Sequence, residues 1–260
     1  MTWTTRPRSE IGPLAAIVAG RGPRVVLLHG VGLRAEAWAR QIDALTVGGF
    51  SVIAPDMPGH GDGPMAEGLT DLQGYAERVL GCLDEPAVVA GHSMGAMIAL
   101  DLAARYPERL RGVMAVNAIF RRGAEAKQAV TTRVAALDGM QAADPTGTLA
   151  RWFGDAPSVE RAACELWLKD CDPAGYKAAY SVFAAEDGPP AGALESLRMP
   201  AFFLTGSEEP NSTPQMSRAM AALVPDGRAE VIALAAHMMP MTHADAVNRK
   251  LLDFASECQP

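Results

Sequence analysis

The chain has 260 residues, of which 49% are hydrophobic and 20% charged, and its net charge is −7 at pH 7. This size and balance suit one globular domain, or one domain that carries an insertion. The acidic charge argues against nucleic acid as a partner, because phosphate backbones would be repelled. No apolar run reaches the roughly 20 residues that span a bilayer, and the N-terminal stretch lacks the apolar core of a signal peptide. We therefore expect a cytoplasmic protein that does not bind membranes.

Short apolar runs alternate with longer amphipathic stretches in the first half of the chain. Runs that are apolar on both faces are typical of buried parallel strands. Strands are predicted in this half at 24–28, 51–54, 86–90 and 111–116. Helices are predicted between them, at 69–83 and 96–106. This alternation predicts an α/β fold, with a mostly parallel central sheet flanked by helices.

The rhythm of strands and helices changes after Asn117. From 119 to 197 the strand-like runs disappear, and alanine-rich helical segments with aromatic residues replace them. Two further strands and a closing helix are predicted beyond this stretch: 200–204, 228–234 and 244–254. We therefore expect one core formed by residues 1–118 and 198–260, interrupted by a helical cap, or lid, at 119–197.

The segment Gly91-His92-Ser93-Met94-Gly95 follows a predicted strand and opens a predicted helix. That is the context of a nucleophile elbow, a strand-to-helix turn so sharp that the residues flanking the serine must be small. The turn exposes the Ser93 oxygen, and the N–H groups of the new helix point to where negative charge develops. The segment therefore predicts that Ser93 is a catalytic nucleophile.

A serine nucleophile needs an adjacent base at neutral pH. His237 follows the last predicted strand, in a loop that can reach over the sheet to Ser93, and we predict that it is the base. His243 lies at the start of the last helix, where we expect a capping or packing role. Structural roles are expected for the other three histidines: His29, His60 and His92.

A carboxylate that orients the base should lie between serine and histidine in the chain, after a strand. Two neighbouring residues, Glu208 and Glu209, meet this condition, and we favour Glu209 because Pro210 fixes the turn beside it. The oxyanion needs two main-chain donors. We predict that these are the N–H of Met94, next to the nucleophile, and the N–H of Val31, in the glycine turn after the first central strand.

Together these residues resemble the α/β-hydrolase superfamily, and the resemblance covers nearly the whole chain. It rests on five segments: His29-Gly30-Val31-Gly32, the D-x-P-G-x-G motif at 56–61, the elbow at 91–95, residues 206–214, and His237. It implies a triad in the order Ser93, Glu209, His237, with the acid three residues after Gly206. Most relatives carry aspartate at that position, so the glutamate is a departure from the family pattern.

Within the superfamily, the chain resembles small capped esterases and 3-oxoadipate enol-lactonases, through residues 172–176 of the predicted cap. Residues 29–38 are also similar to those of pimeloyl-carrier methyl ester esterases. The predicted function is hydrolysis of a small-molecule carboxylic ester or lactone through an acyl-enzyme. One alternative is a C–C bond hydrolase or cofactor-free perhydrolase with the same triad. Another is a non-catalytic ligand-binding protein of the same fold.

Neither a cofactor nor a metal is predicted, because the serine mechanism needs none. The cysteines also form no CxxC pair and no Cys/His cluster with zinc spacing. We expect a monomer or homodimer. Substrate contacts are predicted for Trp152 and Tyr180 in the cap and for Met238 beside the base, as an adaptable apolar wall. A basic run also enters the cap: Arg121, Arg122, Lys127 and Arg133. We interpret it as a solvated helix face, with an anion-binding edge as the alternative.

Overall fold

The computed structural model describes residues 3–259, so Met1, Thr2 and Pro260 of the predicted core ranges lie outside it. One sheet of eight strands has the order β1-β2-β4-β3-β5-β6-β7-β8. Its strands are β1 (Ser9–Ile11), β2 (Leu14–Gly20), β3 (Arg24–Leu28), β4 (Ser51–Pro55), β5 (Ala87–His92), β6 (Leu110–Val116), β7 (Ala201–Gly206) and β8 (Gly227–Ile232). All neighbours from β4 to β8 pair in parallel, which confirms the predicted mostly parallel α/β sheet.

The two strands at the N-terminus form an antiparallel hairpin at the edge of the sheet, and β2 pairs with β4. The turn between β1 and β2 requires a glycine: Gly12 has φ +55°, and a Cβ there would lie 2.1 Å from the carbonyl oxygen of Gly81. The sequence did not predict this hairpin.

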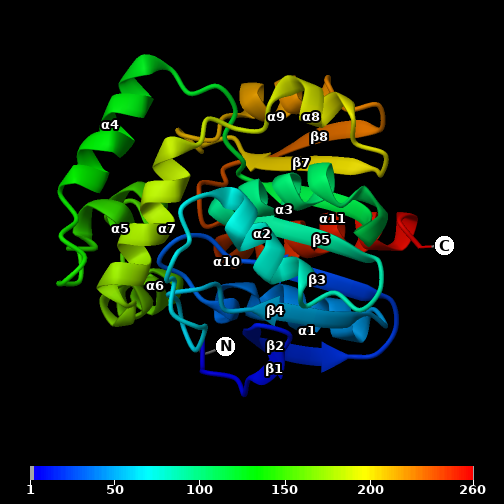
Figure 1. The fold of residues 1–260 in the computed structure, drawn as a ribbon, viewed down its shortest axis with the longest axis horizontal. Coiled ribbons are helices and arrows are strands. Elements are labelled where there is room, and N and C mark those ends of the chain that lie inside the picture. The colour runs from blue at the N-terminus through cyan, green and yellow to red at the C-terminus, as the bar shows by residue number, and fades with distance from the viewer. Residues whose placement is uncertain (1–2, 260) are drawn as a thin grey trace.

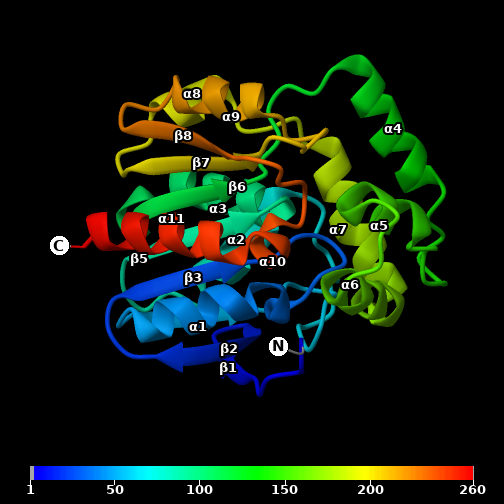
Figure 2. The ribbon, with the colours of Figure 1, turned by 180° about the vertical axis from the view of Figure 1, so that it is seen from behind.

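Helices cover both faces of the sheet, so the central strands are buried on both sides (Figures 1 and 2). The helices of the core are η1 (Ala35–Trp38), α1 (Ala39–Val47), α2 (Leu72–Leu80), α3 (Met94–Arg105), η2 (Pro107–Arg109), α8 (Ala191–Glu195), α9 (Pro214–Ala221), α10 (Met239–Thr242) and α11 (Ala244–Glu257). One hydrophobic cluster joins the sheet to α2, α3 and α9. A second joins it to α1 and α11. Together these two hydrophobic clusters hold the strand ends in fixed positions.

Four helices between β6 and β7 lie together beside the sheet (Figures 1 and 2). We call them the α4–α7 block: α4 (Ala124–Ala135), α5 (Thr146–Phe153), α6 (Val159–Asp170) and α7 (Pro173–Ala185). The next helix, α8, lies against the core instead, with Leu194 buried in the cluster of α2 and α3.

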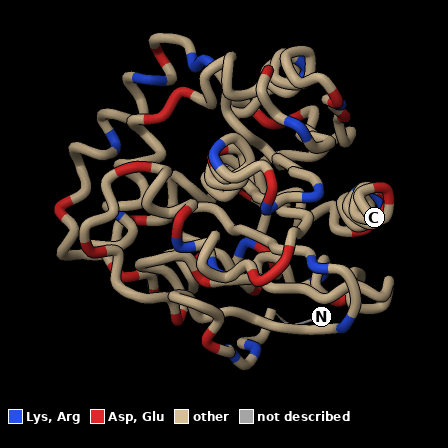
Figure 3. The backbone as a smooth tube through the Cα atoms, turned by 45° about the vertical axis from the view of Figure 1, so that its right-hand side comes forward, with Lys and Arg blue, Asp and Glu red and all other residues tan. Residues whose placement is uncertain are grey.

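Basic and acidic residues are interspersed along the core and the α4–α7 block (Figure 3). Within residues 3–259, no helix is both long and apolar enough to cross a membrane.

Candidate active site

The turn between β5 and α3 places Ser93 at the end of a buried strand. Ser93 has φ 57° and ψ −119°, a backbone conformation that non-glycine residues adopt only under constraint. The flanking glycines allow this turn: a Cβ at Gly91 would lie 2.0 Å from the Gly95 oxygen, and one at Gly95 would lie 2.2 Å from the Leu28 oxygen. The local geometry is therefore that of a nucleophile elbow.

A buried glutamate holds the histidine that follows β8. Glu209 Oε2 lies 2.7 Å from His237 Nδ1, and the Glu209 side chain is fully buried. Its other oxygen accepts the amides of Asn211 at 2.8 Å and Ser212 at 3.2 Å. Burial alone would raise the pKa of the Glu209 carboxyl, but His237 and the two amides outweigh it and bring the pKa to about 2. Glu208, by contrast, is exposed to solvent.

The backbone and ring of His237 are fixed by three neighbours. Its carbonyl oxygen accepts hydrogen bonds from His92 Nε2 at 2.7 Å and from Asn117 Nδ2 at 2.8 Å. The Trp152 ring stacks on its imidazole, with 5.5 Å between ring centroids and 21° between planes. Among the described residues, Ser93 Oγ forms no hydrogen bond with His237, a contact that is often long without substrate. Sequence reasoning missed Asn117, because no motif marks it.

The two predicted oxyanion donors are main-chain amides without a partner in the described part of the chain. The amides of Val31 and Met94 have no hydrogen-bond acceptor among residues 3–259. Gly30 brings the first of these turns against the elbow, since a Cβ there would lie only 3.0 Å from Ser93 Cβ. Both amides are therefore available to a ligand oxygen beside Ser93.

Buried charged side chains hold the segment that follows β3, which contains Val31. Asp56 Oδ1 accepts the Ala35 amide at 2.8 Å, and its Oδ2 pairs with Arg8 Nε at 2.7 Å. Arg8 also pairs with Glu36 at 2.7 Å. Burial acts to raise the pKa of the Glu36 carboxyl, but Arg8, the Arg6 amide and Arg34 together outweigh it and lower the pKa to about 2. The buried ion pairs thus tie the N-terminal segment to the turn that carries Val31.

The remaining histidines serve the fold. His29 Nε2 accepts the Met57 amide at 3.0 Å, and His60 Nδ1 bonds the Pro58 carbonyl. His243 contacts its neighbour Thr242 at the start of α11. In the described part of the chain, no group of three or more His, Cys, Asp or Glu side chains is arranged to hold a metal ion.

A cavity of about 470 Å³ separates the strand ends from the α4–α7 block. Core residues on its wall are Val31, Ser93, Ile119, Asn211, Ser212 and His237. The wall also contains Arg122 and residues of the block: Ala126, Ala129, Val130, Thr132, Arg133, Ala136, Thr148, Arg151, Trp152, Tyr176, Tyr180 and Phe183. Of the predicted substrate contacts, Trp152 and Tyr180 therefore border the same space as Ser93. Met238 does not: it is 1% exposed and buried in a cluster with Leu33 and Met241.

Three arginines line this cavity: Arg122, Arg133 and Arg151. The first two come from the basic run that we interpreted as a solvated helix face, whereas Arg121 and Lys127 of that run are exposed and do not line it. Arg151 was not anticipated, because nothing in its local sequence says which face of α5 meets the cavity.

The chain is similar to known hydrolases in sequence and in fold. Residues 25–250 match the sequence profile of the alpha/beta hydrolase family. The chain is 35% identical over 239 residues to the (E)-2-((N-methylformamido)methylene)succinate hydrolase of Acinetobacter baylyi, covering 89% of this chain and 90% of that protein. It is 30% identical to a pimeloyl-(acyl-carrier protein) methyl ester esterase of Stenotrophomonas maltophilia, covering 94% and 96%. The enol-lactonase of Burkholderia xenovorans superposes with a TM-score of 0.83 at 25% identity, covering 96% and 100%.

Proposed function

Because the chain belongs to the alpha/beta hydrolase family and is an enzyme of the hydrolase type, we propose that it cleaves a small-molecule carboxylic ester or lactone through an acyl-enzyme at Ser93. One observation carries the proposal. The strained Ser93 turn borders the same cavity as His237, whose Nδ1 lies 2.7 Å from a buried Glu209 oxygen. A strained serine and a histidine held by a buried carboxylate are the parts that nucleophilic acyl transfer requires.

The first half of the reaction forms the acyl-enzyme. Ser93 Oγ attacks the carbonyl carbon while His237 Nε2 takes its proton, and Glu209 stabilises the imidazolium through Nδ1–H. The carbonyl oxygen becomes an oxyanion that accepts the N–H groups of Val31 and Met94. When the intermediate collapses, the carbon–oxygen bond breaks and His237 protonates the leaving alcohol.

Water completes the cycle by the same route. His237 takes a proton from the water as it attacks the acyl carbonyl, and the acid is released with Ser93 reprotonated. Trp152 excludes bulk water from one face of the imidazole, which strengthens the charge interactions in the site. We also propose that the α4–α7 block is the substrate cover, with Trp152 and Tyr180 contacting substrate.

Two named relatives support the ester and lactone chemistry, one a methyl ester esterase and the other an enol-lactonase. The Acinetobacter relative is named for a succinate that carries an N-methylformamido group, so such an amide belongs in the substrate panel. A panel of p-nitrophenyl esters of rising acyl length, with lactones and this amide, tests the proposal. We expect ester or lactone turnover by the native enzyme and none above background by Ser93→Ala. Turnover of no member, or equal turnover by both proteins, would contradict it.

A further inference from the structure

The cavity that contains Ser93 has an unbalanced positive charge. Arg122, Arg133 and Arg151 line it, and no Asp or Glu side chain does so among residues 3–259. Within the same residues, none of the three guanidinium groups forms an ion pair at 4.0 Å or less with a carboxylate. Arg122 is buried and Arg133 is half-buried, whereas Arg151 is exposed. For the first two, positive charge partly removed from water without a counter-ion costs free energy, which an anionic ligand would regain.

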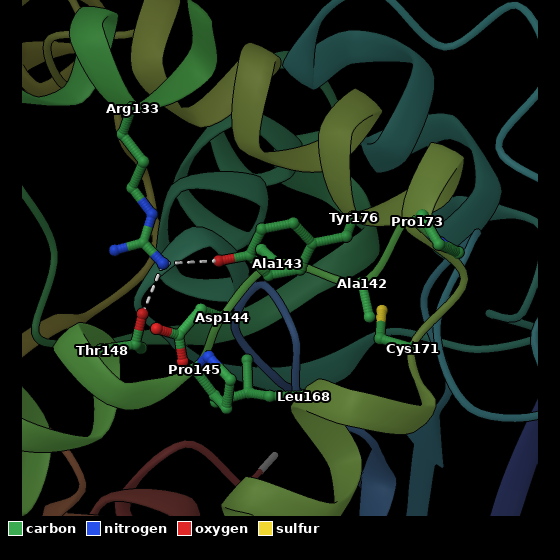
Figure 4. Close-up of a pocket in the computed structure, with 10 residues that line it drawn as sticks. All are labelled: Arg133, Ala142, Ala143, Asp144, Pro145, Thr148, Leu168, Cys171, Pro173 and Tyr176. Atoms are coloured by element: carbon green, nitrogen blue, oxygen red, sulfur yellow. Dashed lines mark hydrogen bonds between the residues drawn. The ribbon is translucent and has the colours of Figure 1, made fainter. Parts of the chain in front are cut away.

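Arg133 is held in place by neutral groups. From α4 its Nη2 donates to Thr148 Oγ1 on α5 and to the Tyr176 hydroxyl on α7, the latter at 3.1 Å (Figure 4). Its guanidinium also stacks over the Tyr180 ring, 5.1 Å from the centroid. These contacts orient the group but leave Nε and Nη1 without an acceptor in the described chain. Asp144, also drawn in Figure 4, is exposed and bonds Thr146 instead.

Arg151 converges on the same hydroxyl. It lies one helical turn after Thr148, and its Nη2 is 3.5 Å from Thr148 Oγ1. The Arg151 residue is exposed, yet desolvation by the surrounding protein lowers the pKa of its guanidinium, and repulsion from Arg133 lowers it further. Two cations from different helices thus approach one neutral oxygen, and an anion shared between them would relieve their repulsion.

Arg122 plays a different part. It is 7% exposed, and its terminal nitrogens donate to the main-chain carbonyls of Glu186 and Phe183. Its guanidinium also lies 4.4 Å from the centre of the Phe183 ring. Arg122 therefore anchors the chain after α7 and adds charge to the cavity, but has few donors left for a ligand.

We propose that Arg133 and Arg151 form the subsite for a carboxylate of the substrate, which makes the substrate an ester or lactone that bears a free acid. This rests on the proposed hydrolysis at Ser93, because one cavity contains both features. The planar fork of arginine matches a carboxylate, and Arg133 keeps such donors free. Alanine and valine side chains of α4 line the cavity as well, at positions 126, 129 and 130. They suit a short methylene spacer between acid and ester.

Two esters of equal chain length isolate the charge. Mono-p-nitrophenyl glutarate ends in a carboxylate where p-nitrophenyl pentanoate ends in a methyl group. We expect Arg133→Gln and Arg151→Gln each to lower kcat/KM for the glutarate ester about 10- to 100-fold, with less than about threefold loss for the pentanoate ester. Arg133→Lys should retain part of the preference. Arg161→Gln, on α6 and away from the cavity wall, is the matched control and should change neither value.

A binding measurement separates this proposal from the proposed reaction. Calorimetry with glutarate on Ser93→Ala needs no turnover, and we expect binding that the added Arg133→Gln change weakens at least tenfold. If no ester is hydrolysed but glutarate binds in this way, the reaction is wrong and the subsite stands. Equal losses for both esters would overturn the subsite. The subsite would also be overturned if Arg133→Gln left the affinity for glutarate unchanged, or if inorganic phosphate bound more tightly than glutarate.

Discussion

The strand ends and the α4–α7 block meet at one cavity, but they satisfy their polar groups differently. Around the elbow, Glu209 and the His237 carbonyl have fixed partners: Glu209 holds His237, and two donors hold the carbonyl, while the amides of Val31 and Met94, without an acceptor among residues 3–259, are left for a ligand. In the block, Arg133 and Arg151 have only neutral partners and spare donors. On our proposals, the core is preorganised for one reaction, whereas the block carries positive charge that an anionic ligand would balance.

The core and the α4–α7 block also differ in how deeply their helices are buried. Nine of the residues of α3 are buried, among them Met94 and Gly95 next to Ser93. The helix α4, which carries Arg133, has no buried residue. Elements with few buried contacts open at low free-energy cost. We therefore expect changes in the core to affect the rate with any substrate, and changes in the block to affect which substrate is preferred.

The largest effect is expected at the nucleophile. Ser93→Ala should keep the melting temperature within a few degrees and lower kcat by about 10⁴ or more, because the attacking oxygen is gone. Steady-state assays on the best ester of the panel measure this. Near-normal turnover would contradict the assignment of the reaction to the core, because Ser93 would then not be the nucleophile.

A loss of similar size is expected for His237→Ala, because nucleophile and base act as a unit. His243→Ala is the matched control, since its side chain contacts Thr242 and does not line the cavity. It should change kcat less than about threefold. Exchange of these two outcomes would show that the base had been assigned to the wrong loop.

A smaller effect is expected at the acid. Glu209→Gln keeps the shape of the side chain but removes the charge that stabilises the imidazolium, so kcat should fall about 100-fold or more. Glu208→Gln should be nearly silent, because that side chain is exposed. Normal activity in both variants would mean that another carboxylate orients His237, although Glu209 is the one within 2.7 Å.

The smallest effect is expected in the block. Trp152 stacks on His237, whereas Trp167 packs edge-on against Trp3 outside the cavity. Trp152→Phe should change the ratio of kcat/KM between short and long acyl esters about three- to tenfold, and Trp167→Phe should leave that ratio unchanged. The acyl-length panel measures both. If Trp152→Phe lowered kcat/KM equally for every ester, Trp152 would act in the reaction itself. The block would then not be restricted to choosing the substrate.

Much of the core could be predicted because its signals are local. The strand predicted at 24–28 coincides with β3, since a continuous apolar run records burial on both faces. The hairpin of β1 and β2 was missed: β1 is a short, largely exposed edge strand beside a charged segment, and its pairing depends on the rest of the sheet.

The candidate site divides in the same way. The elbow at Ser93 is self-contained, because its glycines and its turn lie within five residues of sequence. The cavity-facing role of Arg151 and the burial of Met238 depend on how the block packs against the core. No local pattern carries that information, so periodicity alone could not separate cavity wall from packed interior.

The proposed reaction depends on acylation of Ser93 with the help of His237. Mass spectrometry of the intact protein after treatment with a fluorophosphonate, followed by peptide mapping, tests this most directly. We predict a single adduct on Ser93, none in Ser93→Ala, and labelling slowed by several orders of magnitude in His237→Ala. An adduct on another residue, or undiminished labelling of either variant, would contradict it.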